Sequence, residues 1–139
     1  MTANEKPNIV FILSDDQGYW ALGAAGNNEI HTPNLDNLAN EGVRMDNFFC
    51  TSPVCSPART SILTGKIPSQ HGVHDWLREN EHGEYSNYLQ DQTTYVDLLA
   101  ENGYTCGLSG KWHLGNAYQP PKSFHHWYAL EHGGGPYYN

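Results

Sequence analysis

The feature that most constrains the fold is the segment of residues 55–65, Cys-Ser-Pro-Ala-Arg-Thr-Ser-Ile-Leu-Thr-Gly. Pro57 suits the first turn of a helix, where its missing N–H costs nothing, and Gly65 suits the end of one. The segment therefore predicts a helix with Cys55 at or just before its N-terminus. Free backbone N–H groups and the positive end of the helix dipole favour anion binding there.

Arg59 lies four residues after Cys55, which places both side chains on one face of the predicted helix. A guanidinium group binds two oxygens of a tetrahedral oxyanion with its parallel N–H groups. The pair therefore predicts oxyanion chemistry. Two alternatives are a buried structural cysteine before an ordinary helix and a thiol phosphatase. The phosphatase pattern resembles Cys-x5-Arg, whereas the spacing here is Cys-x3-Arg.

A continuous apolar run over residues 9–13 has the length of a strand that is buried on both faces of a parallel sheet. Asp15 and Asp16 follow it, at the carboxyl end where ligands bind in open α/β sheets. Adjacent carboxylates repel each other unless a cation lies between them, and their oxygens suit Ca²⁺ or Mg²⁺. Residues 43–50, the next predicted strand, would bring Cys55 to the same edge. The residues alone also allow a solvated acidic turn.

The remaining elements follow from caps, breakers and apolar periodicity. A helix is predicted from Pro33, after a Thr32 cap, to Gly42, and another from Thr93 or Thr94 to Gly103. A strand is predicted over residues 104–108, a long polar loop over 66–92 and irregular structure over 116–139. Long loops often form binding surfaces. In this loop, Trp76 and Arg78 either contact a sugar or aryl group or only anchor the loop.

The sequence Gly-Lys-Trp-His-Leu-Gly, residues 110–115, follows the last predicted strand. Lys111 and His113 alternate, so in an extended segment both face the same side. A cation and an imidazole at the edge of a sheet suit an oxyanion and a proton acceptor. A surface turn is the alternative that the residues alone leave open.

These motifs, in this order, resemble the sulfatase family. The match runs from about residue 7 to 115 and covers the first quarter to third of a typical sulfatase. The resemblance implies an α/β, alkaline-phosphatase-like parallel sheet flanked by helices, with residues 1–139 as the N-terminal part of the catalytic domain. Further metal ligands, a second lysine and the acid for the leaving group, which lie downstream in the family, are not assigned in residues 116–139.

The resemblance also implies roles for the nucleophile and the cation. Cys55 would be converted to formylglycine by a maturation enzyme, and the aldehyde hydrate would attack sulfur. Asp15, Asp16 and the modified Cys55 would bind a divalent cation, usually calcium, with magnesium as the alternative. The substrate would be a sulfate ester, either a sulfated carbohydrate or an aryl sulfate.

The same resemblance assigns the other catalytic residues. Arg59 and Lys111 would stabilise charge on the sulfuryl oxygens, and His113 would deprotonate the remaining hydroxyl of the hydrate so that sulfate is eliminated. A phosphonate monoester or phosphodiester hydrolase on the same scaffold is one alternative, because both oxyanions are tetrahedral. A non-catalytic truncated product is another. We expect the 139-residue chain alone not to turn over sulfate esters, since its cation shell and leaving-group acid are incomplete.

Composition excludes several partners. The net charge of −8 over 139 residues argues against nucleic acid, and no stretch of about 18 apolar residues is present to span a membrane. A polar start without a signal peptide predicts a cytoplasmic protein, or a periplasmic or secreted one if a leader has been removed. Three cysteines without zinc-like spacing argue against a disulfide framework. A shortened sheet would favour self-association.

Six of the eight histidines show no shared spacing that fits a known metal site, and we interpret them mainly as surface or loop residues: His71, His74, His82, His125, His126 and His132.

Overall fold

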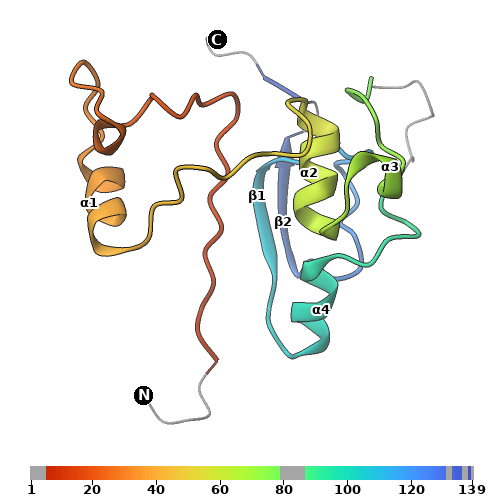
Figure 1. Cartoon of the computed structure of the whole chain (residues 1–139). Coiled ribbons are helices and arrows are strands. Elements are labelled where there is room, and N and C mark those ends of the chain that lie inside the picture. Colours follow the sequence, from red (N-terminus) through yellow and green to blue (C-terminus); the bar gives the residue numbers. More distant parts are fainter. Residues whose placement is uncertain (1–5, 79–86, 131–132, 136–137, 139) are drawn as a thin grey trace. The chain divides into compact units, whose positions relative to one another are not determined.

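The computed structural model describes residues 6–78, 87–130, 133–135 and 138. The chain divides into two compact units, Met1–Phe48 and Phe49–Asn139, which are described separately below. Figure 1 labels the larger elements. In chain order the elements are η1 (Gly23–Ala25), α1 (Pro33–Glu41), α2 (Cys55–Thr64), α3 (Pro68–His71), α4 (Tyr95–Glu101), β1 (Gly107–Lys111) and β2 (His126–Leu130).

The first unit is organised by polar contacts between η1 and α1. The Asp36 carboxylate accepts hydrogen bonds from Ala24 N at 2.7 Å and from Thr32 Oγ1 at 3.0 Å, and Thr32 Oγ1 accepts one from Gly23 N at 2.9 Å. Helix α1 begins at Pro33 after Thr32, and Gly42 is its C-cap. The predicted boundaries of this helix are therefore confirmed.

The predicted strands over residues 9–13 and 43–50 are wrong, because neither segment forms a strand in the structure. The side chains of the first segment are exposed, from 43% at Leu13 to 83% at Val10, and Phe48 and Phe49 are each 81% exposed. A strand is stable only beside a neighbour that pairs its backbone N–H and C=O groups. The apolar residues of these segments predict burial, but they do not show which other segment would pair with them.

The second unit contains a parallel pair of strands, β1 and β2, with Gly107 opposite His126 and Lys111 opposite Leu130. Strand β1 begins and ends three residues later than predicted, so Lys111 is its last residue. The prediction of irregular structure over residues 116–139 is wrong for β2. Its aromatic residues favour a strand, but the parallel partner lies across a crossover of residues 112–125, which local patterns do not reveal.

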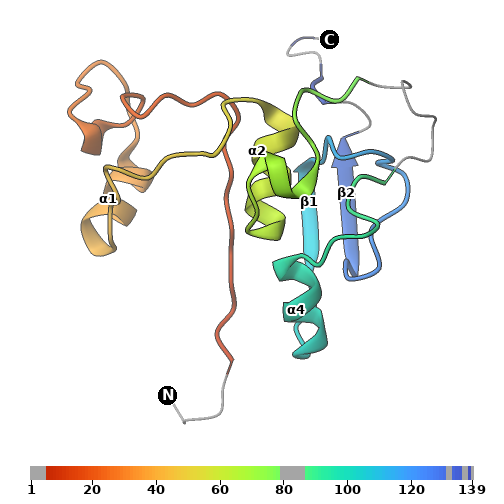
Figure 2. The ribbon, with the colours of Figure 1, turned by 45° about the vertical axis from the view of Figure 1, so that its right-hand side comes forward.

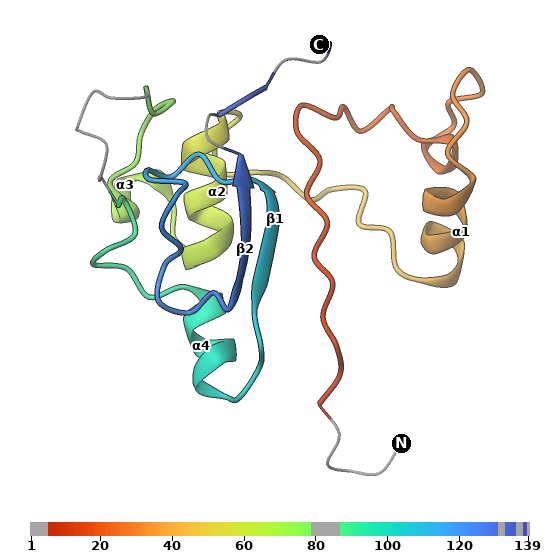
Figure 3. The same cartoon turned by 180° about the vertical axis from the view of Figure 1, so that it is seen from behind.

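The core of the second unit lies on one face of this sheet. Trp112, Leu114 and Leu89 are buried, with exposed fractions of 3%, 0% and 6%. Trp112 contacts the edges of Phe124 and Trp127 with ring centroids 5.9 and 5.0 Å apart. Leu63 of α2, Leu108 of β1 and Ala129 of β2 pack against this cluster, so the core joins α2 to the sheet. Figure 2 and Figure 3 show α2 and α4 beside the strands.

Helix α4 begins after Thr94, the predicted cap, and its C-cap is Asn102, followed by Gly103 with a left-handed backbone. The Asp97 carboxylate accepts hydrogen bonds from Thr94 N and Thr94 Oγ1, both at 2.8 Å, and from Ser123 Oγ. Burial opposes ionisation of Asp97, but the hydrogen bonds from Ser123 and Thr94 and the charge of Lys122 outweigh it and lower its pKa. These contacts tie α4 to the segment before β2.

Within the described ranges, no helix has both the length and the apolar character needed to cross a membrane.

We expect Asp97→Ala to lower the free energy of unfolding by about 1–3 kcal/mol, because it leaves buried donors unsatisfied. Since the pKa of Asp97 is lowered on folding, the stabilisation is present above the ordinary value of 3.8 and is lost as pH falls through the folded-state pKa. Denaturant unfolding over a pH series measures this effect. Asp91→Ala, at an exposed site, is the matched control. If Asp97→Ala lowered the free energy of unfolding by the same amount at low pH, the proposed role of the ionised Asp97 carboxylate would be contradicted.

Candidate active site

Cys55 is the first residue of α2, and the residue before it, Val54, is an extended N-cap with φ −127° and ψ 141°. Gly65 ends the helix in the left-handed conformation, with φ 68°, and its N–H donates to Ser61 O at 2.8 Å. Pro57 lies in the first turn and is buried. Both predicted boundaries are confirmed, and Cys55 lies at the N-terminus of the helix, where the positive end of the helix dipole is located.

Lys111, at the end of β1, reaches across to the start of α2. Its Nζ lies 3.2 Å from Cys55 Sγ. Arg59, one turn into α2, donates from Nη1 to the Lys111 main-chain oxygen at 2.6 Å. The structure therefore brings together Cys55, Arg59 and Lys111, three of the residues singled out by the sequence motifs. One cationic group thus contacts Cys55 at the start of the helix, and a second is bound to the main chain of Lys111.

His113 lies two residues beyond Lys111 and is buried, with 7% of its surface exposed. Its Nε2 lies 2.9 Å from Leu77 O. A carbonyl oxygen only accepts, so in the neutral ring Nε2 carries the proton and Nδ1 the lone pair. Leu77 N in turn donates to Ser56 Oγ at 3.2 Å, which links His113 to the residue directly after Cys55.

Trp76 lies against His113, with ring centroids 5.2 Å apart and planes at 75°. Its indole remains 47% exposed, so it contacts the histidine and solvent together. Arg78 is exposed. The role of either residue in substrate binding stays a prediction. Sequence reasoning missed Ser56 and the Leu77 carbonyl, because a buried serine within the motif and a main-chain oxygen carry no distinctive pattern.

Asp15 and Asp16 belong to the first unit, and both side chains are exposed. Asp16 has a left-handed backbone, with φ 54°. Among the residues that the structure describes, no group of three or more His, Cys, Asp or Glu side chains gathers in a way that would hold a metal ion. The shared cation site of Asp15, Asp16 and Cys55 therefore stays a prediction.

The interpretation of the histidines as surface or loop residues is wrong for His71, which is only 5% exposed. Its Nδ1 accepts from Val73 N at 3.1 Å, and its Nε2 lies 3.0 Å from Ser61 Oγ. Burial lowers its pKa, as do the charges of His74 and Lys66. The neutral ring thus joins α3 to α2. Among the other five, His74, His125 and His126 are exposed, whereas His82 and His132 lie outside the described residues.

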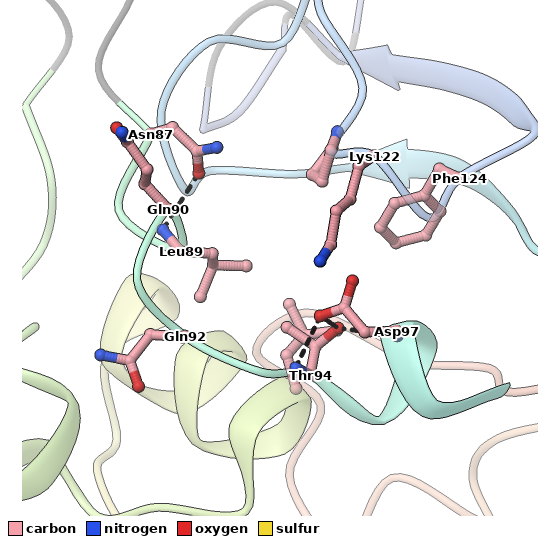
Figure 4. Close-up of a pocket in the computed structure, with 10 residues that line it drawn as sticks. Asn87, Leu89, Gln90, Gln92, Thr94, Asp97, Lys122 and Phe124 are labelled. Atoms are coloured by element: carbon pink, nitrogen blue, oxygen red, sulfur yellow. Dashed lines mark hydrogen bonds between the residues drawn. The ribbon is translucent and has the colours of Figure 1, made fainter. Parts of the chain in front are cut away.

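A pocket of about 220 Å³ opens elsewhere in the second unit, where the Lys122 and Asp97 side chains both border it (Figure 4). Half of the remaining lining residues are polar and half are apolar: Leu63, Asn87, Leu89, Gln90, Gln92, Thr94, Pro121 and Phe124. Leu63 is in the last turn of α2, about 12 Å along the helix from Cys55. The predicted catalytic residues do not line this pocket.

Comparison with known proteins gives a consistent result. The family model described as Sulfatase matches residues 7–139. N-acetylglucosamine-6-O-sulfatase of Bacteroides thetaiotaomicron is 38% identical over 137 residues, covering 97% of this chain and 23% of that protein. Arylsulfatase H of Homo sapiens is 37% identical over 146 residues, with 96% and 26% covered.

The structure of BT4656 in complex with its substrate D-glucosamine-2-N,6-O-disulfate matches with a TM-score of 0.72 and 38% identity. The match covers 88% of this chain and 23% of that one. The chain thus spans about a quarter of the length of the relatives it matches. Its parallel strands and flanking helices are part of an α/β, alkaline-phosphatase-like fold, which confirms the expected fold class. The family model covers most of the chain, and the chain belongs to the sulfatase family.

Proposed function

We propose that this chain carries the nucleophilic centre of a sulfuric ester hydrolase, with residue 55 as the nucleophile. The observation that carries the proposal is the approach of Lys111 Nζ to Cys55 Sγ at 3.2 Å, while Arg59 is held on the Lys111 carbonyl. Family membership supports the same chemistry. Sulfate is a tetrahedral oxyanion, and cations beside a helix N-terminus match its charge.

Lys111 and Arg59 would stabilise the charge that develops on the sulfuryl oxygens. The hydrogen bond to the Lys111 main chain holds the Arg59 guanidinium in place before substrate arrives. Preorganised charges of this kind lower a barrier because they need no reorganisation during the reaction. Backbone N–H groups at the start of α2 add partial positive charge at the same place.

Conversion of Cys55 to formylglycine would supply a geminal diol, whose second hydroxyl lets sulfate leave without a second attack on sulfur. His113 is suited to take the proton from that hydroxyl. Because its Nε2 proton is directed at Leu77 O, the lone pair of the neutral ring is on Nδ1. An imidazole is effective in this role because it titrates near neutral pH.

A divalent cation is proposed at Asp15, Asp16 and residue 55. Carboxylate and hydroxyl oxygens form a donor set that suits calcium, with magnesium as the alternative. Bound there, the cation would help neutralise the sulfuryl oxygens. Calcium takes about six to eight oxygen ligands, so these three residues supply only part of its shell.

For the substrate, we favour a sulfated carbohydrate over an aryl sulfate. The bacterial relative is an N-acetylglucosamine-6-O-sulfatase, and the matched solved structure contains a disulfated glucosamine. Trp76, half exposed beside His113, offers an aromatic surface on which a sugar ring can pack. Residues 1–139 would then form part of the catalytic domain.

The proposed reaction is tested with the product of the complete gene, matured at residue 55 and supplied with calcium. We expect it to hydrolyse an aryl sulfate at least about 10-fold faster than an aryl phosphate diester, a difference that corresponds to roughly 1.4 kcal/mol in the barrier. Faster hydrolysis of the diester would favour a phosphoryl-transfer enzyme. Absence of turnover with either ester would favour a non-catalytic product.

Maturation is predicted at Cys55 and at neither Cys50 nor Cys106, since only Cys55 has Pro and Arg two and four residues later. After coexpression with a formylglycine-generating enzyme, peptide mass spectrometry should show sulfur and two hydrogens replaced by one oxygen at Cys55. The other two cysteines serve as internal controls. Modification confined to Cys50 or Cys106 would refute the assignment.

Arg59→Lys should reduce kcat/KM by about 10²–10³, the usual cost of removing one donor to a developing oxyanion. Lysine keeps the charge but loses the planar fork that both binds oxyanions and reaches the Lys111 carbonyl. Arg44→Lys, at a surface ion pair with Asp46, is the matched control and should keep near-wild-type kinetics. Equal kinetics for the two variants would mean that Arg59 does not contact the reacting group.

A further inference from the structure

His113 adopts a backbone conformation that its surroundings must maintain. Its φ is 57°, in the left-handed region, which is unfavourable for a residue with a side chain. The imidazole is nevertheless buried, and two segments far apart in sequence meet at the ring: Trp76 with Leu77, and Gly133. Ser56 of a third segment contacts Leu77.

One hydrogen bond fixes which edge of the His113 imidazole faces Leu77. Leu77 O accepts the Nε2 proton of His113 at 2.9 Å. Leu77 is itself held by its N–H, which donates to the hydroxyl of Ser56 at 3.2 Å. Ser56 is completely buried in the first turn of α2, so this hydroxyl is anchored to the helix that begins at Cys55. Helix and imidazole are thus connected by two successive hydrogen bonds.

The other contacts fix the plane of the ring. Trp76 meets it at 75°, with centroids 5.2 Å apart. The Gly133 backbone comes so close that a Cβ there would lie 2.5 Å from His113 Cε1 and 2.7 Å from Nδ1. Real Cβ atoms do not make such contacts, so any side chain at residue 133 would displace the imidazole. A Cβ added at the next residue, Gly134, would meet no atom within 4 Å among the described residues, its two chain neighbours apart.

We propose that Ser56, Trp76 and Gly133 are positioning residues that hold His113 in one tautomer and one orientation. Ser56 acts through the Leu77 carbonyl, which keeps the proton on Nε2, and Gly133 and Trp76 limit rotation of the ring. The inference rests on the proposed function, in which the Nδ1 lone pair accepts the proton of the hydroxyl at residue 55. Proton transfer needs a correctly protonated and directed base, so looser packing should slow it.

The matched pair Gly133→Ala and Gly134→Ala provides the test. In protein with ¹⁵N-labelled histidine, at a pH where the ring is neutral, the His113 nitrogens should report a single Nε2–H tautomer in the wild type. Gly133→Ala should produce a mixture with the Nδ1–H form, whereas Gly134→Ala should leave the spectrum unchanged. Identical spectra for the two variants would overturn the proposal. Because this readout needs no turnover, it is independent of whether the protein hydrolyses sulfate esters.

Two further variants, each with a matched control, keep the test decisive if Gly133→Ala does not fold. Ser56→Ala removes the acceptor for Leu77 N, whereas Ser61→Ala removes a hydroxyl of the same helix that contacts His71 instead. We expect only Ser56→Ala to mix the tautomers. Trp76→Ala, at a half-exposed site, should also mix them, whereas Trp20→Ala, at another exposed tryptophan, should not.

In the complete gene product, we expect Ser56→Ala to lower kcat about 10-fold, to change KM little and to shift the pH profile. Ser61→Ala, as a purely structural change, should leave that profile in place. A Ser56→Ala variant with a wild-type pH profile and a wild-type His113 spectrum would contradict the proposal.

Discussion

The site depends on two contacts that join the N-terminal half of α2 to the last residue of β1. Lys111 spans the distance to Cys55 with its side chain, and its main chain binds Arg59. Each contact orients a cation, and both lie above a core in which Leu63, Leu108 and Ala129 pack around Trp112 and Leu114. The apolar cluster determines how helix and strand lie together, and within that arrangement Lys111 contacts Cys55 and Arg59 contacts the Lys111 main chain.

The sequence predicts local features of this site well. Helix α2 has the expected ends because Pro57 and Gly65 act within a few residues of their own position. The same holds for α1 between Thr32 and Gly42 and for the Thr94 cap of α4. Cys55 and Arg59 are paired by helical spacing alone. For Lys111 and His113, alternation indicated a shared side, but only the family resemblance connected them to the start of the helix.

The failures concern contacts between distant segments. The apolar run over residues 9–13 indicates burial. Strand formation also requires a pairing strand, which the local pattern does not identify. Strand β2 was missed because its partner lies beyond a long crossover. His71 is buried through contacts with α2, and Gly133 is required by an imidazole twenty residues away. Neither has a local signal, because the role of each depends on a contact with a residue elsewhere in the sequence.

The proposed chemistry requires Cys55 and Lys111 to face each other in one site. A short reagent that reacts with a thiol at one end and an amine at the other measures this directly in protein that retains unmodified Cys55. Peptide mass spectrometry should then identify Cys55 joined to Lys111, since their reactive atoms are 3.2 Å apart. Cys55 joined only to Lys66 or Lys122, with no Lys111 product, would contradict the arrangement of α2 and β1 on which the proposed chemistry depends.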